Sequence, residues 1–185
     1  AFGPRVPAMT FHTYLRALDG PIAFARFTGQ TIIKNGVPLV SYPQPAEAEK
    51  VITNLAEKRG CFYHFVSAEQ IKEKSSLFSE QHFDFIWKTE KWEDLTITLS
   101  GRHQQLNAAC ALSCVMILKE SGFDIPNKSI YVGLKSARWP GRLEMVKTNP
   151  VILLDGAHNP AGAAVLSDTV KQYFSGKQVH LILGV

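Results

Sequence analysis

The stretch VILLDGAHNPAGAAVL, residues 151–166, decides the fold. Its first four residues are apolar and Asp155 follows, which predicts a strand buried on both faces. Asn159 can cap a helix and Pro160 suits the first helical position, so a helix is expected after the loop. A second apolar run, VHLILGV at 179–185, follows that helix. Strand, helix and strand in this order predict a βαβ unit of a parallel sheet.

Upstream of this unit, residues 1–140 also follow an α/β pattern. The run VPLVS at 37–41 predicts a strand. The residues from Pro45 to Gly60 predict a helix, because their apolar positions recur at helical spacing and the glycine can end it. CFYHFV at 61–66 predicts the next strand, so these three elements form another βαβ pattern.

The middle of the chain predicts an antiparallel strand pair and a long helix. Apolar and polar residues alternate at 83–88 and 95–99, which predicts two strands with a turn near Glu90–Asp94. The residues from Arg102 to Ser121 predict a helix buried on most sides, because AACALSCVMIL at 108–118 is almost wholly apolar. Shorter helices are expected at 11–18 and 125–137, and the capping-box spacing of Ser67 and Gln70 predicts that another short helix begins there. The predicted fold class is α/β, with a parallel sheet and an antiparallel strand pair.

The composition of the 185 residues is that of an ordinary globular protein, with 45% hydrophobic and 19% charged residues. This mixture excludes a disordered, collagen-like or coiled-coil chain. The net charge of +4 is small and the basic residues are scattered, so nucleic-acid binding is poorly supported and an anionic small ligand suits the chain as well. No apolar run is long enough to predict a transmembrane span, and no secretory signal is expected at the start.

The three cysteines, Cys61, Cys110 and Cys114, indicate reduced thiols and a cytoplasmic protein. Cys110 and Cys114 lie one helical turn apart and could hold a metal ion, but no further Cys or His pair completes a site. Their neighbours are apolar, so small core residues are the favoured interpretation and no metal ligand is predicted.

The start of the long helix carries polar residues that the fold alone does not require. His103 and Asn107 in LSGRHQQLNAA are four positions apart and share a helix face, near the helix start where ligands commonly bind. An Asn amide presents a donor and an acceptor together, which suits the edge of an adenine. Asn107 could instead be hydrogen-bonded only to backbone, and the spacing alone favours that plainer interpretation.

Two loops carry the other candidate residues. Arg142, on the Pro-Gly loop WPGRLE, is placed to reach a phosphate, although an ordinary surface arginine is the plainer interpretation. Asp155 and His158 follow a strand at the edge where ligands bind in open α/β sheets. The Asp155 carboxylate suits ribose hydroxyls or a metal-bound phosphate, or it only braces the turn. The His158 ring suits a phosphoryl oxygen.

Taken together, these segments resemble a known family. LSGRHQQLNAACAL, WPGRLE and ILLDGAHNPAGAAVL are similar, in this order, to successive motifs of the folylpolyglutamate synthases and dihydrofolate synthases of the Mur ligase superfamily. IIKNGVPLVSYPQPAEA resembles the stretch after the catalytic lysine region of the same enzymes, so the resemblance covers about residues 32–185. It implies part of a P-loop-type central domain at 1–140 and the first βαβ of a smaller α/β C-terminal ligase domain at 141–185.

The resemblance also implies an activity. Such an enzyme uses ATP and Mg²⁺ to phosphorylate a carboxylate of folate or dihydropteroate, and the amino group of L-glutamate attacks the acyl phosphate. By resemblance, Asn107 is the adenine contact, Arg142 a phosphate contact and Asp155 a ribose or phosphate contact. His158 and Asp155 are the candidate catalytic residues. A monomer is expected.

The chain departs from the family pattern in its first part. No G-x-x-x-x-G-K-[ST] string occurs, and the family's Mg²⁺-binding residues and carbamylated lysine are not recognisable, since Lys34 lies beyond the expected place. An incomplete or gapped chain is favoured over a degenerate one, and these 185 residues alone are expected not to turn over ATP. The alternative functions are a Mur-type ligase for a peptidoglycan precursor and a non-catalytic nucleotide-binding module.

Overall fold

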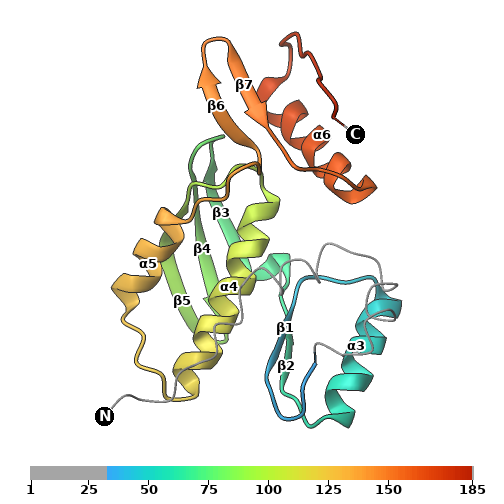
Figure 1. The fold of residues 1–185 in the computed structure, drawn as a ribbon. Helices are drawn as coiled ribbons and strands as arrows, with labels where there is room; N and C mark the ends of the chain where they lie inside the picture. The colour runs from blue at the N-terminus through green and yellow to red at the C-terminus, as the bar shows by residue number, and fades with distance from the viewer. Residues whose placement is uncertain (1–32, 185) are drawn as a thin grey trace. The chain divides into compact units, whose positions relative to one another are not determined.

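The computed structural model describes residues 33–184, which fall into two units (Figure 1). In the described range, the first unit holds the residues up to Gln70 together with Ala109–Asp124. The second unit holds Ile71–Ala108 and the residues from Ile125 onward. The short helix expected at 11–18 lies outside the described residues. In the part of the chain that is described, no helix combines the length and the apolar character needed to cross a membrane.

The first unit contains the predicted βαβ pattern. β1 (Leu39–Ser41) and β2 (Tyr63–Phe65) pair in parallel, and α3 (Ala46–Lys58) connects them. Pro45 precedes α3, and Gly60 follows it with a φ of 60°, a conformation that glycine adopts without steric cost. The prediction for this stretch is confirmed. Its small core contains Leu39, Ala56 and Cys61.

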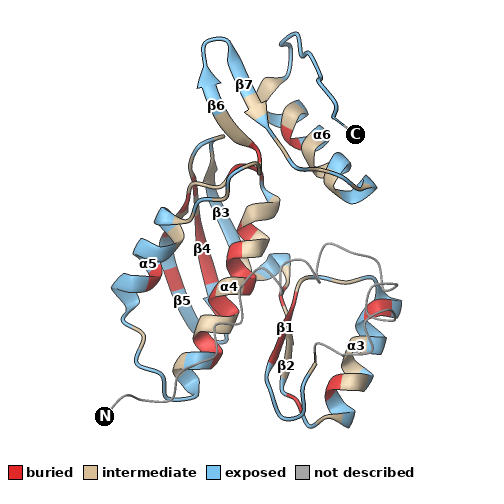
Figure 2. Cartoon of the chain, viewed as in Figure 1, coloured by how far each residue is buried: buried red, intermediate tan, exposed pale blue. Residues whose placement is uncertain are grey.

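The second unit is built on an antiparallel sheet of three strands in the order β3-β4-β5. β4 (Gln81–Trp87) and β5 (Glu90–Ile97) are the predicted strand pair, whereas β3 (Ile71–Ser76) was not predicted. The sequence of β3 is IKEKSS, and its exposed Lys and Glu residues give no apolar alternation, as is common for an edge strand. Figure 2 shows buried positions along β4 and β5. Phe83, Phe85, Leu95 and Ile97 are almost completely buried, and Trp87 and Trp92 are buried as well.

The predicted turn near Glu90–Asp94 is wrong. Trp87 pairs with Glu90, so the turn consists of Lys88 and Thr89. The register between β4 and β5 shifts further along, where Asp94 has a φ of 56°. This bulge interrupts the alternation of side chains at the place where the sequence pattern predicted a turn.

The predicted helices of the middle region are confirmed. The long one is α4 (His103–Glu120), and the shorter ones are α5 (Asn127–Ser136) and the 3₁₀ turn η1 (Ala68–Gln70). At η1 the backbone N–H of Ser67 donates to Oε1 of Gln70 at 3.1 Å, which is one half of the expected capping box. Residues of α4 up to Ala108 belong to the second unit and those after it to the first.

Cys110 and Cys114 lie on α4, as predicted. Burial raises the pKa of the Cys110 thiol to about 12 and that of the Cys114 thiol to about 11. Both thiols are therefore protonated at neutral pH and behave as small apolar groups, which supports the interpretation that they are packing residues.

The C-terminal part of the second unit differs from the predicted parallel βαβ unit. α6 (Pro160–Phe174) is the expected helix, but β7 (Val151–Leu154) pairs antiparallel with an unpredicted strand, β6 (Glu144–Thr148). The strand expected at 179–185 is wrong as far as Gly184, because these residues pair with no strand in the described chain. An apolar run becomes a strand only where a neighbouring strand satisfies its backbone groups. Without one, Leu181 and Ile182 are exposed.

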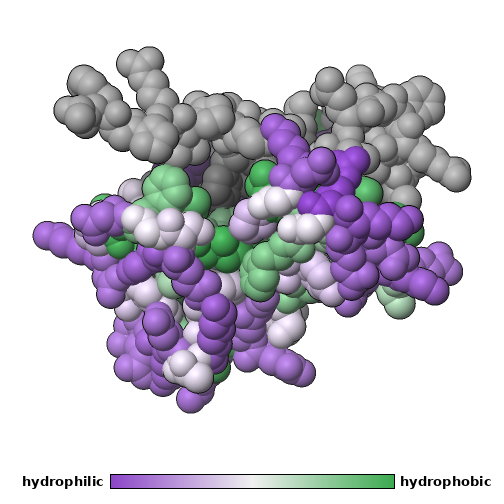
Figure 3. Space-filling model, turned by 90° about the horizontal axis from the view of Figure 1, so that it is seen from below, coloured by the Kyte–Doolittle hydropathy of each residue, from purple (hydrophilic) through white to green (hydrophobic). Residues whose placement is uncertain are grey.

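The surface of the described residues is mixed. Figure 3 shows a face on which hydrophilic residues cover most of the area and hydrophobic residues form smaller areas. This agrees with the ordinary composition of the chain, because scattered apolar residues are normal on a protein surface.

Candidate functional site

The Asp155 carboxylate holds together the two loops that carry the candidate residues of the C-terminal part. Its Oδ1 accepts a hydrogen bond from the backbone N–H of Ala157 at 2.8 Å, and its Oδ2 accepts one from the backbone N–H of Leu143 at 2.9 Å. Asp155 therefore braces the turn, which was one of the interpretations that the sequence left open. Each oxygen keeps a second lone pair for a ligand hydroxyl, so the bracing role does not occupy the carboxylate fully.

The loop that carries Arg142 is also held by a second carboxylate, which the sequence analysis missed. The Glu144 carboxylate accepts from the backbone N–H of Gly141 at 2.8 Å, and Gly141 has a φ of 72°. The backbone N–H of Arg142 donates to the Trp139 carbonyl at 3.3 Å. The only signal for Glu144 was its position three residues after a loop glycine, which is too common to single it out.

His158 lies on the exposed loop before α6. Its Nδ1 is 2.8 Å from the Gly156 carbonyl oxygen. A carbonyl can only accept, so Nδ1 carries the hydrogen, and Nε2 can donate to a phosphoryl oxygen only when the ring is protonated. The cap that positions this loop is the predicted one: Oδ1 of Asn159 accepts from the backbone N–H of Gly162 at 2.7 Å, and Pro160 opens the helix.

Asn107 lies on the first turns of α4 and belongs to a chain of polar side chains there. Its Nδ2 donates to Oε1 of Gln104 at 3.0 Å, and Nε2 of Gln104 donates to Nε2 of His103 at 3.1 Å. The Asn107 amide is thus bound to a side chain rather than to backbone. The structure places the four predicted residues in two groups, with Asn107 on α4 and the other three on the loops around β6 and β7.

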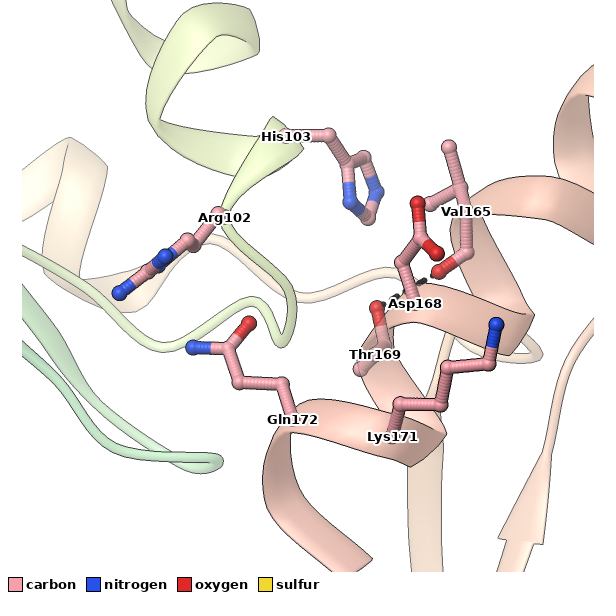
Figure 4. Close-up of a pocket in the computed structure, with 7 residues that line it drawn as sticks. All are labelled: Arg102, His103, Val165, Asp168, Thr169, Lys171 and Gln172. Carbon is pink, nitrogen blue, oxygen red and sulfur yellow. Dashed lines mark hydrogen bonds between the residues drawn. The ribbon is translucent and has the colours of Figure 1, made fainter. Parts of the chain in front are cut away.

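A cavity of about 530 Å³ lies in the second unit, between the start of α4 and α6 (Figure 4). Its lining residues are Arg102, His103, Val165, Asp168, Thr169, Lys171 and Gln172. Figure 4 shows the α6 side chains across from His103, and the hydroxyl of Thr169 donates to the Val165 carbonyl at 2.8 Å. Of the residues singled out in the sequence, only His103 lines this cavity, so it is distinct from the predicted ligand positions.

No group of three or more His, Cys, Asp or Glu side chains suited to a metal ion is found among residues 33–184. The described residues therefore give no donor set from which a Mg²⁺ position can be derived.

Comparisons with known proteins identify relatives of this chain by sequence. The model of the Mur ligase, glutamate ligase domain matches residues 141–185. A dihydrofolate synthase/folylpolyglutamate synthase of Bacillus subtilis is 33% identical over 173 residues, which are 92% of this chain and 40% of that protein. The chain belongs to the folylpolyglutamate synthase and dihydrofolate synthase family. It spans well under half the length of this relative.

Solved structures of the family have the same fold. The folylpolyglutamate synthase of Thermotoga maritima superposes with a TM-score of 0.68 and 38% identity, over 78% of this chain and 34% of that one. A folylpolyglutamate synthase in complex with AMPPCP and folate superposes with a TM-score of 0.72 and 30% identity, over 78% of this chain and 36% of that one. The α/β fold class, with parallel and antiparallel sheets, is therefore confirmed.

Proposed function

We propose that the protein carrying this chain is an ATP-dependent ligase that joins L-glutamate to a carboxylate of folate or dihydropteroate. The observation that carries the proposal is the 33% identity to the Bacillus subtilis enzyme over 92% of the chain. The relative solved with AMPPCP and folate supports it, because that protein binds an ATP analogue and a folate. The chain spans 40% of the Bacillus subtilis enzyme, so the activity is proposed for the protein that carries it.

In this reaction the γ-phosphoryl group of ATP would pass to the carboxylate, which releases ADP and forms an acyl phosphate. The amino group of glutamate would then attack the acyl carbon and displace phosphate, which gives the amide. Asn107 would bind the adenine edge through its amide, which can donate and accept at once. Arg142 would bind phosphate oxygens through its guanidinium group.

Asp155 suits the ribose better than the phosphates. Its carboxylate would repel a phosphate in the absence of an intervening cation, whereas its remaining lone pairs can accept from ribose hydroxyls. His158, when protonated, would donate from Nε2 to a phosphoryl oxygen while Nδ1 stays bound to the Gly156 carbonyl. The resemblance implies Mg²⁺ as the second cofactor, and residues 33–184 contain no group of three or more His, Cys, Asp or Glu side chains suited to hold it.

The remaining expectations fit the same proposal. The boundary between a central ATP-binding domain and the ligase domain is placed after residue 140, which is supported by the family match that begins at 141. The protein is proposed to act as a monomer in the cytoplasm, and the free thiols of its three cysteines support a reducing compartment.

The test is a ligation assay on the protein that carries residues 1–185, with ATP, Mg²⁺, radiolabelled L-glutamate and either dihydropteroate or a folate as acceptor. The expected product gains one glutamyl residue and appears only with ATP. Arg142→Ala is expected to abolish most of the product. The matched control is Arg138→Ala, because Arg138 binds the carbonyls of Lys135 and Ala137 rather than the candidate loops. Absence of product with both acceptors would contradict the proposal.

A further inference from the structure

A fully buried glutamine, Gln81, is the first residue of β4 and pairs with Ile97, the last residue of β5, after which the chain continues into α4. Its side chain is 0% exposed, yet both hydrogens of its amide are bound: Nε2 donates to the Leu99 carbonyl at 2.7 Å and to the Gly101 carbonyl at 2.9 Å. A buried amide with all of its groups satisfied restricts its surroundings to one arrangement, because breaking any of these bonds leaves a polar group without water. Gln81 therefore holds the loop that precedes α4.

The bonds of Gln81 continue along α4 to Asn107. The Gly101 carbonyl that Gln81 binds also accepts the backbone N–H of Gln104 at 3.0 Å, which opens the helix. The side chain of Gln104 then accepts the Asn107 amide at 3.0 Å. The orientation of the Asn107 side chain thus depends on a loop that Gln81 holds.

A second link binds Gln81 to α4 directly. Nε2 of Gln105, itself 4% exposed, donates to Oε1 of Gln81 at 3.0 Å and to Oε2 of Glu73 at 3.1 Å. The other oxygen of Glu73 pairs with Arg102 at 3.2 Å. Arg102 and Gln105, at the start of α4, are therefore bound to Glu73 on β3, and Gln105 is also bound to Gln81 on β4.

The side-chain oxygen of Gln81 is also connected to α6 through two hydrogen bonds. The Ser76 hydroxyl donates to Oε1 of Gln81 at 3.2 Å and lies 2.6 Å from the Tyr173 hydroxyl. Ser76 has one hydrogen, so Tyr173 is the donor of the second bond. The Tyr173 ring also packs edge-on against Phe78, with the ring centres 5.5 Å apart. Tyr173, Ser76 and Gln81 thus form one directed chain of hydrogen bonds.

We propose that Gln81 is a positioning residue for Asn107. The hydrogen bonds from Tyr173 through Ser76 to Gln81 then couple the orientation of the Asn107 side chain to the packing of α6 against β3. The proposal rests on the proposed function for the role of Asn107 in binding adenine. Under this proposal, Gln81 on β4 and Tyr173 in the segment 141–185, which matches the glutamate ligase domain, both affect the affinity for the nucleotide. Neither side chain would touch the nucleotide itself.

The test compares three variants of the 185-residue chain by isothermal titration with ATP and by the NMR signals of the Asn107 side-chain amide. Gln81→Leu is expected to weaken ATP binding about tenfold and to shift the Asn107 signals already without ATP. Tyr173→Phe keeps the ring and removes only the hydroxyl, and it is expected to shift the same signals with a smaller loss of affinity. It also keeps the test decisive if Gln81→Leu does not fold.

The matched control is Asp84→Asn. Asp84 is on the same strand and 1% exposed, but its partners are Lys74, Lys91 and the backbone N–H of Asp94. This variant is expected to lower stability and to leave the Asn107 signals and ATP affinity unchanged. Unmoved Asn107 signals in Tyr173→Phe, or an equal shift in Asp84→Asn, would overturn the proposal. If the unsubstituted chain does not bind ATP, the role of Asn107 fails, while the signals without ATP still decide whether Gln81 positions it.

Discussion

The start of α4 and the loop before α6 both carry candidate ligand-binding side chains, but they are held in different ways. At α4 the bonds run between side chains that are distant in sequence, with buried Gln81 and Gln105 at the centre. At the loop before α6, one partly exposed carboxylate, Asp155, binds the backbone of its own loop and of the loop at Leu143. The comparison shows that Asn107 depends on a packed interior, whereas the C-terminal candidates depend on local turn chemistry.

The largest expected effect compares a buried side chain of the sheet that supports α4 with an exposed side chain of the segment that follows α6. Leu95→Ala in β5 removes a side chain that is 0% exposed and is expected to lower the free energy of unfolding by about 2–5 kcal/mol. Leu181→Ala removes one that is 77% exposed and is expected to change it by less than about 0.5 kcal/mol. Urea unfolding followed by circular dichroism measures both. Similar decreases in the free energy of unfolding for the two variants would contradict the difference in packing between these two parts of the chain.

A pair of glycines tests how closely the α4 start is packed. Gly101 and Gly141 both have positive φ, of 95° and 72°, so alanine strains the backbone at each. A Cβ at Gly101 would lie 2.6 Å from Cε1 of His103, whereas a Cβ at Gly141 meets nothing within 4 Å. The His103 ring must turn aside, so Gly101→Ala is expected to cost about 0.5–1.5 kcal/mol more than Gly141→Ala in thermal unfolding. Equal costs would mean that backbone strain alone operates at both sites.

Acid sensitivity is expected in the sheet that supports α4. The hydrogen bond from Lys74 holds the pKa of Asp84 at about 2, below its ordinary value of 3.8. A carboxyl whose pKa is lowered by folding stabilises the protein above the unfolded pKa, and that contribution is lost as the pH falls through about 2. Unfolding of Asp84→Asn is therefore expected to depend less on pH between about 4 and 2, by at most about one proton. Identical pH profiles would refute the role of this ion pair.

The smallest effect is expected at the helix that follows the second loop. Asn159→Ala removes the side chain that caps α6 through Gly162 and is expected to cost about 1 kcal/mol. Hydrogen exchange should report it as faster exchange in the first turn of α6, with the amides of β4 unchanged. Loss of protection in β4 as well would show that the two regions are not held independently.

The sequence predicted the helices of the described residues but missed two strands, β3 and β6, for physical reasons. Helical spacing and terminal glycine or proline are local signals, so α3, α4, α5 and α6 were found. β3 is a charged edge strand without alternation, and the bulge at Asp94 imitated a turn. The apolar run at 179–185 predicted a strand, but a strand also needs a neighbour, which the local pattern does not supply.

In the candidate site, too, the sequence predicted local contacts and missed contacts between residues that are distant in sequence. The loop from Asp155 to Pro160 was predictable because its capping and turn residues act on their own neighbours. Gln81 and Gln105 gave no signal, because their partners are set by tertiary packing and an isolated glutamine on a strand or helix is unremarkable in sequence.

The most direct test of the account is the nucleotide preference of Asn107. Titration of the chain with ATP and with GTP should show tighter binding of ATP, by about tenfold if one adenine-specific hydrogen bond is made. Asn107→Ala should bring the affinity for ATP down to that for GTP and leave the affinity for GTP unchanged. Equal affinities for the two nucleotides in the unsubstituted chain, or an ATP preference that survives in Asn107→Ala, would contradict the assignment of Asn107 as the adenine contact.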